Sequence, residues 1–389
     1  MPKKKKKSFF NSILLRGKSD YALWVVTFLL LALGLIMVLS SSTPAALKDS
    51  KGESSYGYLL HQLRAAGVGL FFMYIASRVN ITKIKPITWA IYLFFTALMI
   101  YTGFYGNEAG GARRWLYLPM LGSFQPSEMA KIGFIFVFAH YLSYVNNKKT
   151  IKKWVSGILI PILMLVPIVY GVFIKQNHLS ATILIGATTI IQMFVAGVSI
   201  PQLILTLLAG AGLVLGADKL IHPNGNDGFR SDRIEAWQNP EKYATGKGFQ
   251  VLQGLYAIAS GGILGVGLGN SKQKYIIPEP QNDFIFAVLC EELGFLGALT
   301  VIILFVVLIW RGLTIARKSK DIYAKLVALG ITVTMGLQFI INIAVVTNTI
   351  PVTGVPLPFF SYGGTALIVN LISIGLLQSV ARYNNIEEE

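Results

Sequence analysis

The sequence predicts an all-α polytopic membrane protein with about ten transmembrane helices. Of the 389 residues, 54% are hydrophobic and only 13% are charged, whereas an average soluble protein carries about 25% charged residues. The apolar residues form long runs of roughly 20, the length that spans a bilayer as a helix. These runs lack the alternation of membrane β-strands, which argues against a barrel. The high apolar content also excludes disordered and collagen-like chains.

Ten apolar runs are candidate spans. The first runs from Tyr21 to about Ser40 behind a basic segment. It resembles a signal peptide but exceeds the usual core of roughly 7–15 residues, so we interpret it as an uncut first span. The other nine are expected at about 61–79, 84–104, 126–145, 154–173, 180–196, 201–217, 284–311, 322–347 and 360–381.

The distribution of charge predicts the orientation of these spans. The chain has 34 Lys+Arg against 18 Asp+Glu, a net charge of +16. Positively charged connections tend to remain in the cytoplasm, and basic residues gather in the N-terminal tail and in alternate connections, including Lys148–Lys153 and Arg311–Lys325. We therefore expect both termini in the cytoplasm. Topology accounts for most of the positive surplus, so nucleic-acid binding is not expected.

The chain is expected to have five parts. They are a basic cytoplasmic tail (1–20), spans 1–7 (21–217), a large extracellular loop (218–283), spans 8–10 (284–381) and a cytoplasmic tail (382–389). A loop this long is usually functional or disordered, and its many apolar residues argue against disorder. The helical spacing in 248–259 predicts a helix lying on the outer membrane surface. The one cysteine, Cys290, cannot form an internal disulfide and is interpreted as a small buried residue.

Asp283 stands out among the few acidic residues expected on the outer side. It follows Pro278 and Pro280 at the start of the eighth span, and prolines preset the backbone before a helix. Either Asp283 caps this helix, or it is a base held at the rim of a membrane cavity. A helix from Asp283 to Arg311 would be about 43 Å long. That exceeds the hydrocarbon core of about 30 Å, so we expect it to tilt or to project outward.

Glu128 and Lys131 form a second candidate site at the start of the fourth span. Their spacing places both on one helix face, and Pro126 suits the first helical position. Lys131 lies about one turn inside the span, where a charge is costly and generally faces a cavity or a partner. A structural ion pair and a role in substrate binding are both consistent with this pattern.

Four arginines form a third candidate site. Arg113 and Arg114 lie in the first long outer connection, and Arg230 and Arg233 lie in the large loop. The orientation rule predicts little positive charge there. They could contact anionic lipid headgroups, or they could clamp a diphosphate, because guanidinium groups bind phosphate oxygens in pairs.

Two further segments carry weaker signals. His178 begins the sixth span, where a lone histidine is more often an interfacial side chain than a catalyst. The stretch 351–364 contains Ser361 and ends in Gly363 and Gly364. It predicts a rigid outward turn whose glycines allow close approach to a helix or a ligand. The sequence has no P-loop, zinc-binding, HExxH or GxSxG pattern, so chemistry that requires them is not expected.

A set of short segments occurs in order over nearly the whole chain. They are Gly111–Trp115, Gln125–Lys131, Asn239–Pro240, Gly248–Gln250, Gly265–Ser271, Pro278–Phe286, Glu291–Gly294 and Pro356–Gly364. Taken together, these segments resemble the SEDS family (shape, elongation, division and sporulation), which includes FtsW, RodA and SpoVE. The sequence of 278–281 looks closer to FtsW and SpoVE than to RodA.

The resemblance implies a peptidoglycan glycosyltransferase of the cell membrane that polymerises lipid II into glycan strands on the extracellular side. Such enzymes work with a cognate class B penicillin-binding protein, and the FtsW branch works with other divisome proteins. The family's essential aspartate falls on Asp283, here preceded by Asn282 where many members have threonine. Many members also have an acidic residue in the region of His178. The expected substrate-binding residues are Glu128, Lys131, Arg113, Arg114, Arg230, Arg233, His178 and Ser361.

The implied mechanism uses Asp283 as general base on the 4-hydroxyl of the acceptor sugar, with undecaprenyl diphosphate as leaving group. A divalent cation, Mg or Mn, could accompany the diphosphate, and no protein ligands for it are assigned. The alternatives are a lipid II flippase and a scaffold that recruits the crosslinking partner. Within the family the division branch is favoured over the elongation and sporulation branches.

Overall fold

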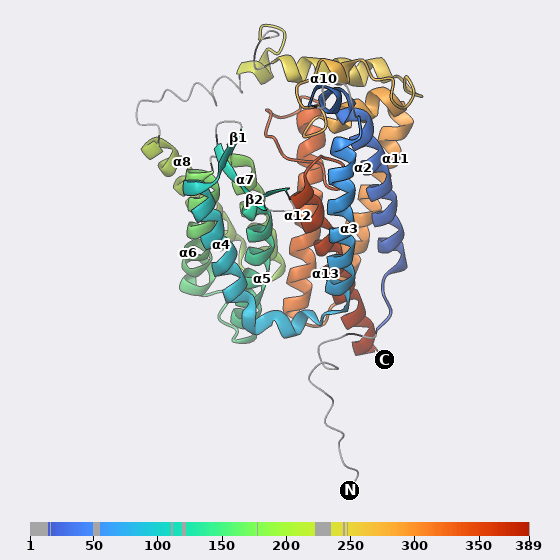
Figure 1. Ribbon diagram of the computed structural model, residues 1–389. Coiled ribbons are helices and arrows are strands. Elements are labelled where there is room, and N and C mark those ends of the chain that lie inside the picture. Colours follow the sequence, from blue (N-terminus) through green and yellow to red (C-terminus); the bar gives the residue numbers. More distant parts are fainter. Residues whose placement is uncertain are drawn as a thin grey trace.

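The computed structural model describes residues 15, 17–49, 55–109, 112–118, 122–176, 178–221, 235–243, 246 and 248–388. Arg230 and Arg233, two of the expected diphosphate contacts, lie outside these residues. The described chain forms a bundle of long helices with one helix lying across its end (Figure 1).

Every expected span coincides with a helix. The helices are α2 (Tyr21–Asp49), α3 (Gly57–Arg78), η1 (Ile81–Ile87), α4 (Thr88–Tyr105), α5 (Pro126–Asn147), η2 (Val155–Leu159), α6 (Ile160–Val169), η3 (Tyr170–Lys175), α7 (Leu179–Val195), α8 (Ile200–Ile221), α10 (Phe249–Gly261), η4 (Gln273–Tyr275), α11 (Ile285–Lys318), α12 (Ile322–Val346) and α13 (Gly364–Glu388). In the described part, seven helical segments are long and apolar enough to cross a membrane, and Leu179–Val195 and Ile200–Gly216 are shorter apolar helices. The chain is a multi-pass membrane protein.

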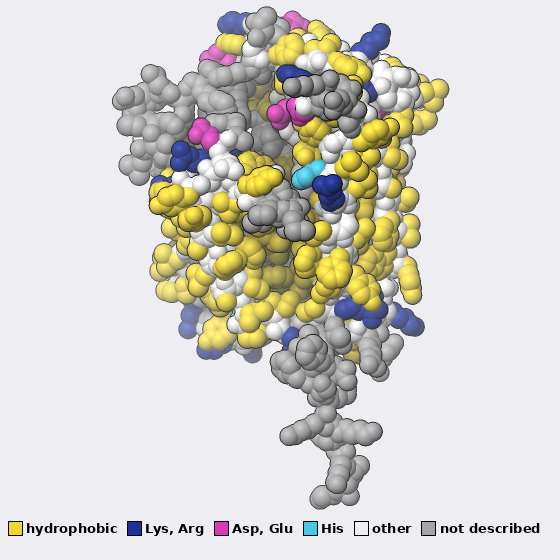
Figure 2. All heavy atoms as spheres, viewed as in Figure 1, with side chains coloured by type: hydrophobic (Ala, Val, Ile, Leu, Met, Phe, Trp, Pro, Cys, Tyr) yellow, Lys and Arg dark blue, Asp and Glu magenta, His cyan; other side chains and the backbone are white. Residues whose placement is uncertain are grey.

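The helices form two groups that meet at α5, α7 and α12. One group contains α4 to α8, and the other contains α2, α3, α11, α12 and α13 (Figure 1). Hydrophobic side chains cover the middle of the visible face, and this face is hollowed between the two groups (Figure 2). Helix α10 lies across one end, called the α10 end below, and confirms the helix predicted for 248–259. The opposite end, where α2 begins and α13 ends, is called the terminal end.

The first long connection contains a small antiparallel sheet, so the prediction of an all-α chain is wrong in this detail. Strands β1 (Asn107–Ala109), β2 (Ala112–Leu118) and β3 (Gly122–Phe124) pair in that order within the first long connection. Two of the strands have only three residues, too few to show a hydrophobic alternation in the sequence.

The helix predicted from Asp283 to Arg311 is not continuous, which corrects that expectation. Gly294 has φ 65° and ψ −165° inside α11, a conformation that essentially only glycine adopts. The residues before it, Ile285–Leu293, form a short helix, called the half-helix below. Two backbone amides of the glycine-rich loop bond to its last carbonyls: Val266 N donates to Glu291 O at 2.9 Å and Gly267 N to Glu292 O at 3.0 Å.

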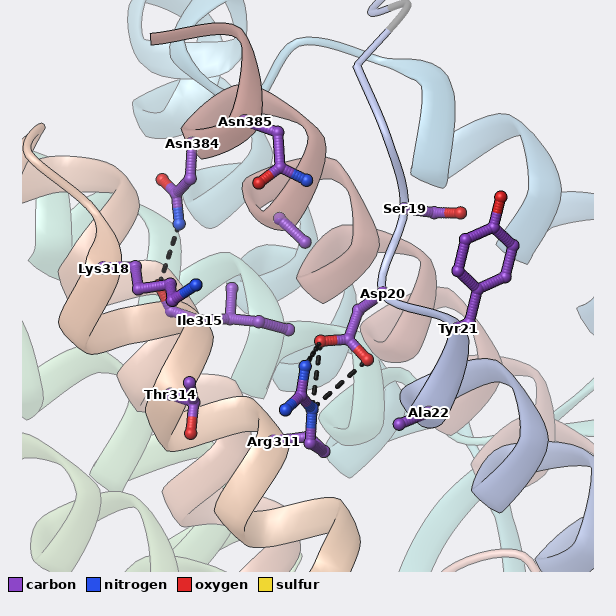
Figure 3. Close-up of a pocket in the computed structure, with 11 residues that line it drawn as sticks. Ser19, Asp20, Tyr21, Ala22, Arg311, Thr314, Ile315, Lys318, Asn384 and Asn385 are labelled. Carbon is purple, nitrogen blue, oxygen red and sulfur yellow. Dashed lines mark hydrogen bonds and ion pairs between the residues drawn. The ribbon is translucent and has the colours of Figure 1, made fainter. Parts of the chain in front are cut away.

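The first and last helices are tied together at the terminal end. The side chain of Gln378 accepts a bond from Asp20 N at 2.9 Å and returns one to Asp20 O at 2.7 Å. The Asp20 carboxylate also pairs with Arg311 of α11. Asp20 and Arg311 border a cavity of about 310 Å³. Figure 3 shows Lys318 and Asn384 on its other wall.

Candidate functional site

Asp283 lies directly before the half-helix at the α10 end. The N-cap position belongs to Phe284, which makes no side-chain capping bond, so Asp283 stands one residue outside the position from which a side chain usually caps. Asn342 of α12 donates from Nδ2 to Asp283 O at 2.8 Å and to Val355 O at 2.9 Å. The backbone of Asp283 is therefore held against α12, and its half-buried side chain extends toward Gly354.

The turn before α13 is bound to the segment that carries Asp283. Ser361 is buried, and its Oγ accepts a bond from Leu357 N at 2.7 Å, inside the turn. Tyr362 N donates to Gln281 O at 2.8 Å. Burial, and then the nearby Asp49 carboxylate, raise the pKa of the Tyr362 hydroxyl above its ordinary value.

Glu128 and Lys131 form a buried ion pair in the first turns of α5. Lys131 Nζ lies 2.8 Å from Glu128 Oε1, and the two residues are 6% and 7% exposed. The ion pair that the spacing predicted is confirmed, while the role in substrate binding stays a prediction. The start of α5 is also tied to α13, because Gln125 N donates to Thr365 Oγ1 at 3.3 Å.

The two described arginines of the predicted clamp point to different partners. Arg114 Nε donates to Gln176 O at 2.8 Å, whereas Arg113 is exposed and donates from Nη1 to Phe104 O at 2.9 Å. Consecutive residues of a strand face opposite sides, so Arg113 and Arg114 do not form one paired clamp. Only Arg114 reaches the segment that leads into α7.

His178 caps α7. Its Nδ1 accepts a bond from Ala181 N at 3.2 Å, so the side chain has a structural role as a cap. A role of His178 in substrate binding stays a prediction. Two residues later, Ser180 Oγ donates to Thr353 O at 2.6 Å. Thr353 precedes Gly354, the residue toward which the Asp283 side chain extends.

These bonds connect the starts of α5, α7, α11 and α13 at one end of the bundle. Hydrogen bonds therefore link, one to the next, the segments that carry four residues far apart in the sequence: Glu128, His178, Asp283 and Ser361. Their roles in catalysis and substrate binding stay predictions.

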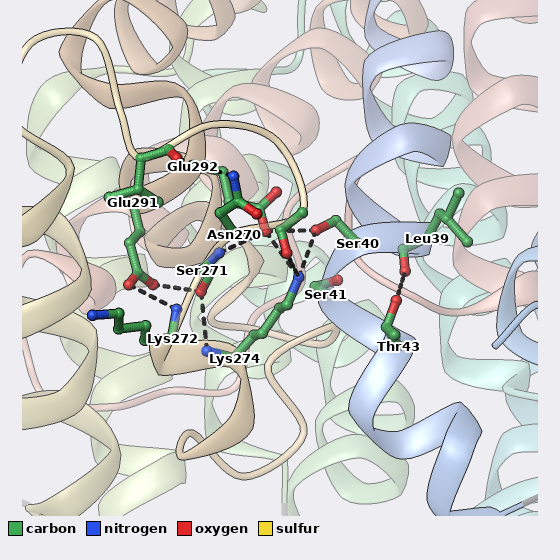
Figure 4. A network of polar contacts seen from close by, with 12 residues as sticks. Leu39, Ser40, Ser41, Thr43, Asn270, Ser271, Lys272, Lys274, Glu291 and Glu292 are labelled. Carbon is green, nitrogen blue, oxygen red and sulfur yellow. Dashed lines mark hydrogen bonds and ion pairs between the residues drawn. The ribbon is translucent and has the colours of Figure 1, made fainter. Parts of the chain in front are cut away.

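A buried charged network was missed by sequence reasoning. It joins Glu291 and Glu292 of the half-helix with Lys274 and Ser271 of the preceding loop and with Ser40 of α2 (Figure 4). The sequence does contain a signal for this network, namely two adjacent acidic residues within an apolar helix. Charges inside a spanning helix are costly unless they have partners.

The described residues do not form a metal centre. No three or more His, Cys, Asp or Glu side chains among them gather in a way that could hold an ion.

Comparisons with known proteins agree over nearly the full length. The family profile described as FtsW/RodA/SpoVE, cell cycle protein, matches residues 20–386. Stage V sporulation protein E of Bacillus subtilis is 39% identical over 375 residues, which cover 94% of this chain and 97% of that protein. A probable peptidoglycan glycosyltransferase FtsW of Coxiella burnetii is 36% identical and covers 93% and 96%.

The fold also matches a solved structure. A chain described under "Structural coordination of polymerization and crosslinking by a peptidoglycan synthase complex" superposes with a TM-score of 0.76 at 27% identity, covering 94% of this chain and 98% of that chain. The resemblance predicted from the ordered motifs is thus confirmed. The chain belongs to the FtsW/RodA/SpoVE family of cell cycle proteins.

Proposed function

We propose that this protein is a peptidoglycan glycosyltransferase that polymerises lipid II, with Asp283 as general base. The observation that carries the proposal is the placement of Asp283: a half-buried carboxylate whose backbone is fixed by Asn342, at the end where four helix starts are bonded in series. The names of relatives that match over nearly the whole chain support the same activity.

In the proposed reaction the Asp283 carboxylate takes the proton from the 4-hydroxyl of the acceptor sugar. The resulting oxygen forms a bond to the anomeric carbon of the donor, and the bond from that carbon to the diphosphate breaks. Undecaprenyl diphosphate leaves with the electron pair. General base catalysis of this kind typically contributes about 10²–10⁴-fold to the rate.

The leaving diphosphate requires stabilisation of its charge. We propose Lys131 and Arg114 for this role among the described candidates, because each belongs to a segment bonded into the site. We further propose that a divalent cation, where it takes part, enters with the diphosphate. The hollow between the two helix groups (Figure 2) supports a lateral path for the lipid tails.

The proposed orientation has ten spans, both termini in the cytoplasm and the α10 end outside. The basic connections support it. We propose a cognate class B penicillin-binding protein as partner, supported by the synthase complex in which the matching solved chain occurs. We also propose the division branch. Depletion that gives filaments would support that branch, whereas round cells would assign the protein to elongation.

The test is polymerisation of purified lipid II by the protein with its partner. Asp283→Asn should reduce the rate by at least about 100-fold. Glu279→Gln is the matched control, since it neutralises an exposed carboxylate four residues away and should leave the rate unchanged. Polymer formed by Asp283→Asn at the wild-type rate would reject Asp283 as the base.

A lipid II flippase is the alternative that the cavity at the terminal end could favour, because a transporter needs polar groups at both ends. There, however, the Arg311 guanidinium is bound by Asp20 and the Asn384 amide by Ile315 O at 2.9 Å. A flipping assay in liposomes, run beside the polymerisation assay, separates the two activities. The two assays together also identify a scaffold, which would show neither polymerisation nor flipping.

A further inference from the structure

Three ionisable side chains that the proposed reaction does not use are buried together, eight or nine residues from Asp283 in the sequence. Glu292, Glu291 and Lys274 are 0%, 2% and 3% exposed. Removing an ion from water costs several kcal/mol unless its partners replace the solvent. A buried charge therefore needs hydrogen-bond partners, and each of the three side chains has several (Figure 4). On Glu292 they all bind Oε1, while Oε2 is buried without one.

Glu291 holds the loop that precedes the half-helix. Its carboxylate accepts bonds from Lys272 N at 3.0 Å, from Gln273 N at 3.2 Å and from the Ser271 hydroxyl. Charge-assisted bonds to backbone amides are stronger than neutral ones and fix direction. The last turn of the half-helix is thereby bound to the start of η4.

Glu292 and Lys274 extend this attachment to α2. Lys274 Nζ lies 3.2 Å from Glu292 Oε1 and donates to Gly269 O at 2.6 Å and to Ser40 Oγ at 3.2 Å. The Ser40 hydroxyl in turn donates to Glu292. One ammonium group therefore joins the half-helix, the glycine-rich loop and the first spanning helix.

The break at Gly294 makes this attachment consequential. The half-helix continues into the rest of α11 only through a residue that has left the helical conformation. The half-helix, Ile285–Leu293, is about 14 Å long at 1.5 Å per residue, so a tilt of about 4° at the break moves its start, next to Asp283, by about 1 Å. A displacement of that size can reduce a rate about 10²-fold.

We propose that Glu291, Glu292 and Lys274 are positioning residues that fix the tilt of the half-helix and so place the Asp283 carboxylate for catalysis. The inference rests on the proposed function. The network fixes the end of the half-helix next to the break, and Asn342 fixes the end next to Asp283. Both attachments are needed to define one orientation.

The decisive variant is the double substitution Lys274→Met with Glu292→Gln. A single change leaves the other charge buried without its partner, which by itself can unfold the protein. The double variant removes both charges while keeping similar side-chain volumes. Lys85→Met with Asp321→Asn is the matched control, because it removes an ion pair of 2.9 Å outside the network. Asparagine can still cap α12 at position 321.

Two readouts are measured on the full-length protein in nanodiscs with its partner. Hydrogen exchange of 283–293 should be at least tenfold faster in the double variant, with α12 and α13 unchanged. The kcat for lipid II polymerisation should fall at least tenfold while KM stays within twofold. Lys274→Arg, which keeps the charge and the donors, should retain most of the wild-type kcat, and the control pair should change neither readout.

Wild-type exchange in 283–293, or a wild-type kcat despite faster exchange, would overturn the proposal. A raised KM with unchanged kcat would do so too, because it would indicate that the network binds substrate. Failure of the proposed function is recognised separately, by Asp283→Asn remaining fully active. The exchange readout still reports whether the network orients the half-helix in that case.

Discussion

The break in α11 predicts that alanine is not tolerated at Gly294. At φ 65° and ψ −165°, a residue with a side chain is strained by about 1–3 kcal/mol. A Cβ there would also lie 2.3 Å from Gly265 N and 2.5 Å from Ile263 O. Both are backbone atoms of the crossing loop, and they can move only if the loop separates from α11. We therefore expect Gly294→Ala to destabilise the protein by at least about 2 kcal/mol.

The assay is thermal unfolding in detergent together with lipid II polymerisation. Gly210→Ala in α8 is the control, since a Cβ there meets nothing within 4 Å and alanine favours a helix over glycine by up to about 1 kcal/mol. Gly294→Ala should lower the unfolding temperature and the polymerisation rate, whereas Gly210→Ala should leave the rate unchanged and the temperature equal or higher. Equal behaviour of the two variants would refute the interpretation of Gly294 as an obligatory break.

Three further predictions concern the ends of the helices that meet at the site. Glu128→Gln should destabilise the protein by about 3–5 kcal/mol, because the Lys131 charge stays buried, and adding Lys131→Met should recover part of this loss in thermal unfolding. Asn342→Leu leaves two carbonyls without their donor, so unfolding experiments should show a loss of about 1–3 kcal/mol and polymerisation should slow. Arg114→Gln should reduce the polymerisation rate more than Arg113→Gln does. The exposed Arg113 side chain should also contribute less than about 1 kcal/mol to the free energy of unfolding. Equal reductions of the rate by the two substitutions would contradict the assigned orientations.

Much of the helical architecture could be predicted because it depends on local sequence. A run of about 20 apolar residues defines a spanning helix without reference to its neighbours, and the helices α2 to α8 and α11 to α13 lie where such runs occur. The Glu128–Lys131 pair was accessible for the same reason, since a spacing of three places two side chains on one helix face.

The break in α11 and the buried network could not be predicted, because both depend on contacts distant in sequence. A glycine within an apolar helix is usually tolerated, and the need for glycine at position 294 becomes visible only where the backbone of the loop at Gly265 fills the place of a Cβ. Likewise, the attachment of Asp283 to α12 requires Asn342, 59 residues away. The candidate residues could thus be named from sequence, whereas what holds them in place could not.

The ties between Asp20 and Gln378 affect how the protein matures during synthesis. The two residues are 358 positions apart, and ribosomes add roughly 5–20 residues per second. Gln378 is therefore synthesised on the order of 20–70 s after Asp20, when nearly all the other helices have been made. Until then the polar groups at the start of the first helix must be satisfied by water or lipid headgroups. Completion of the bundle is therefore a late event, and a chain truncated before α13 should insert into the membrane without assembling and be exposed to membrane proteases.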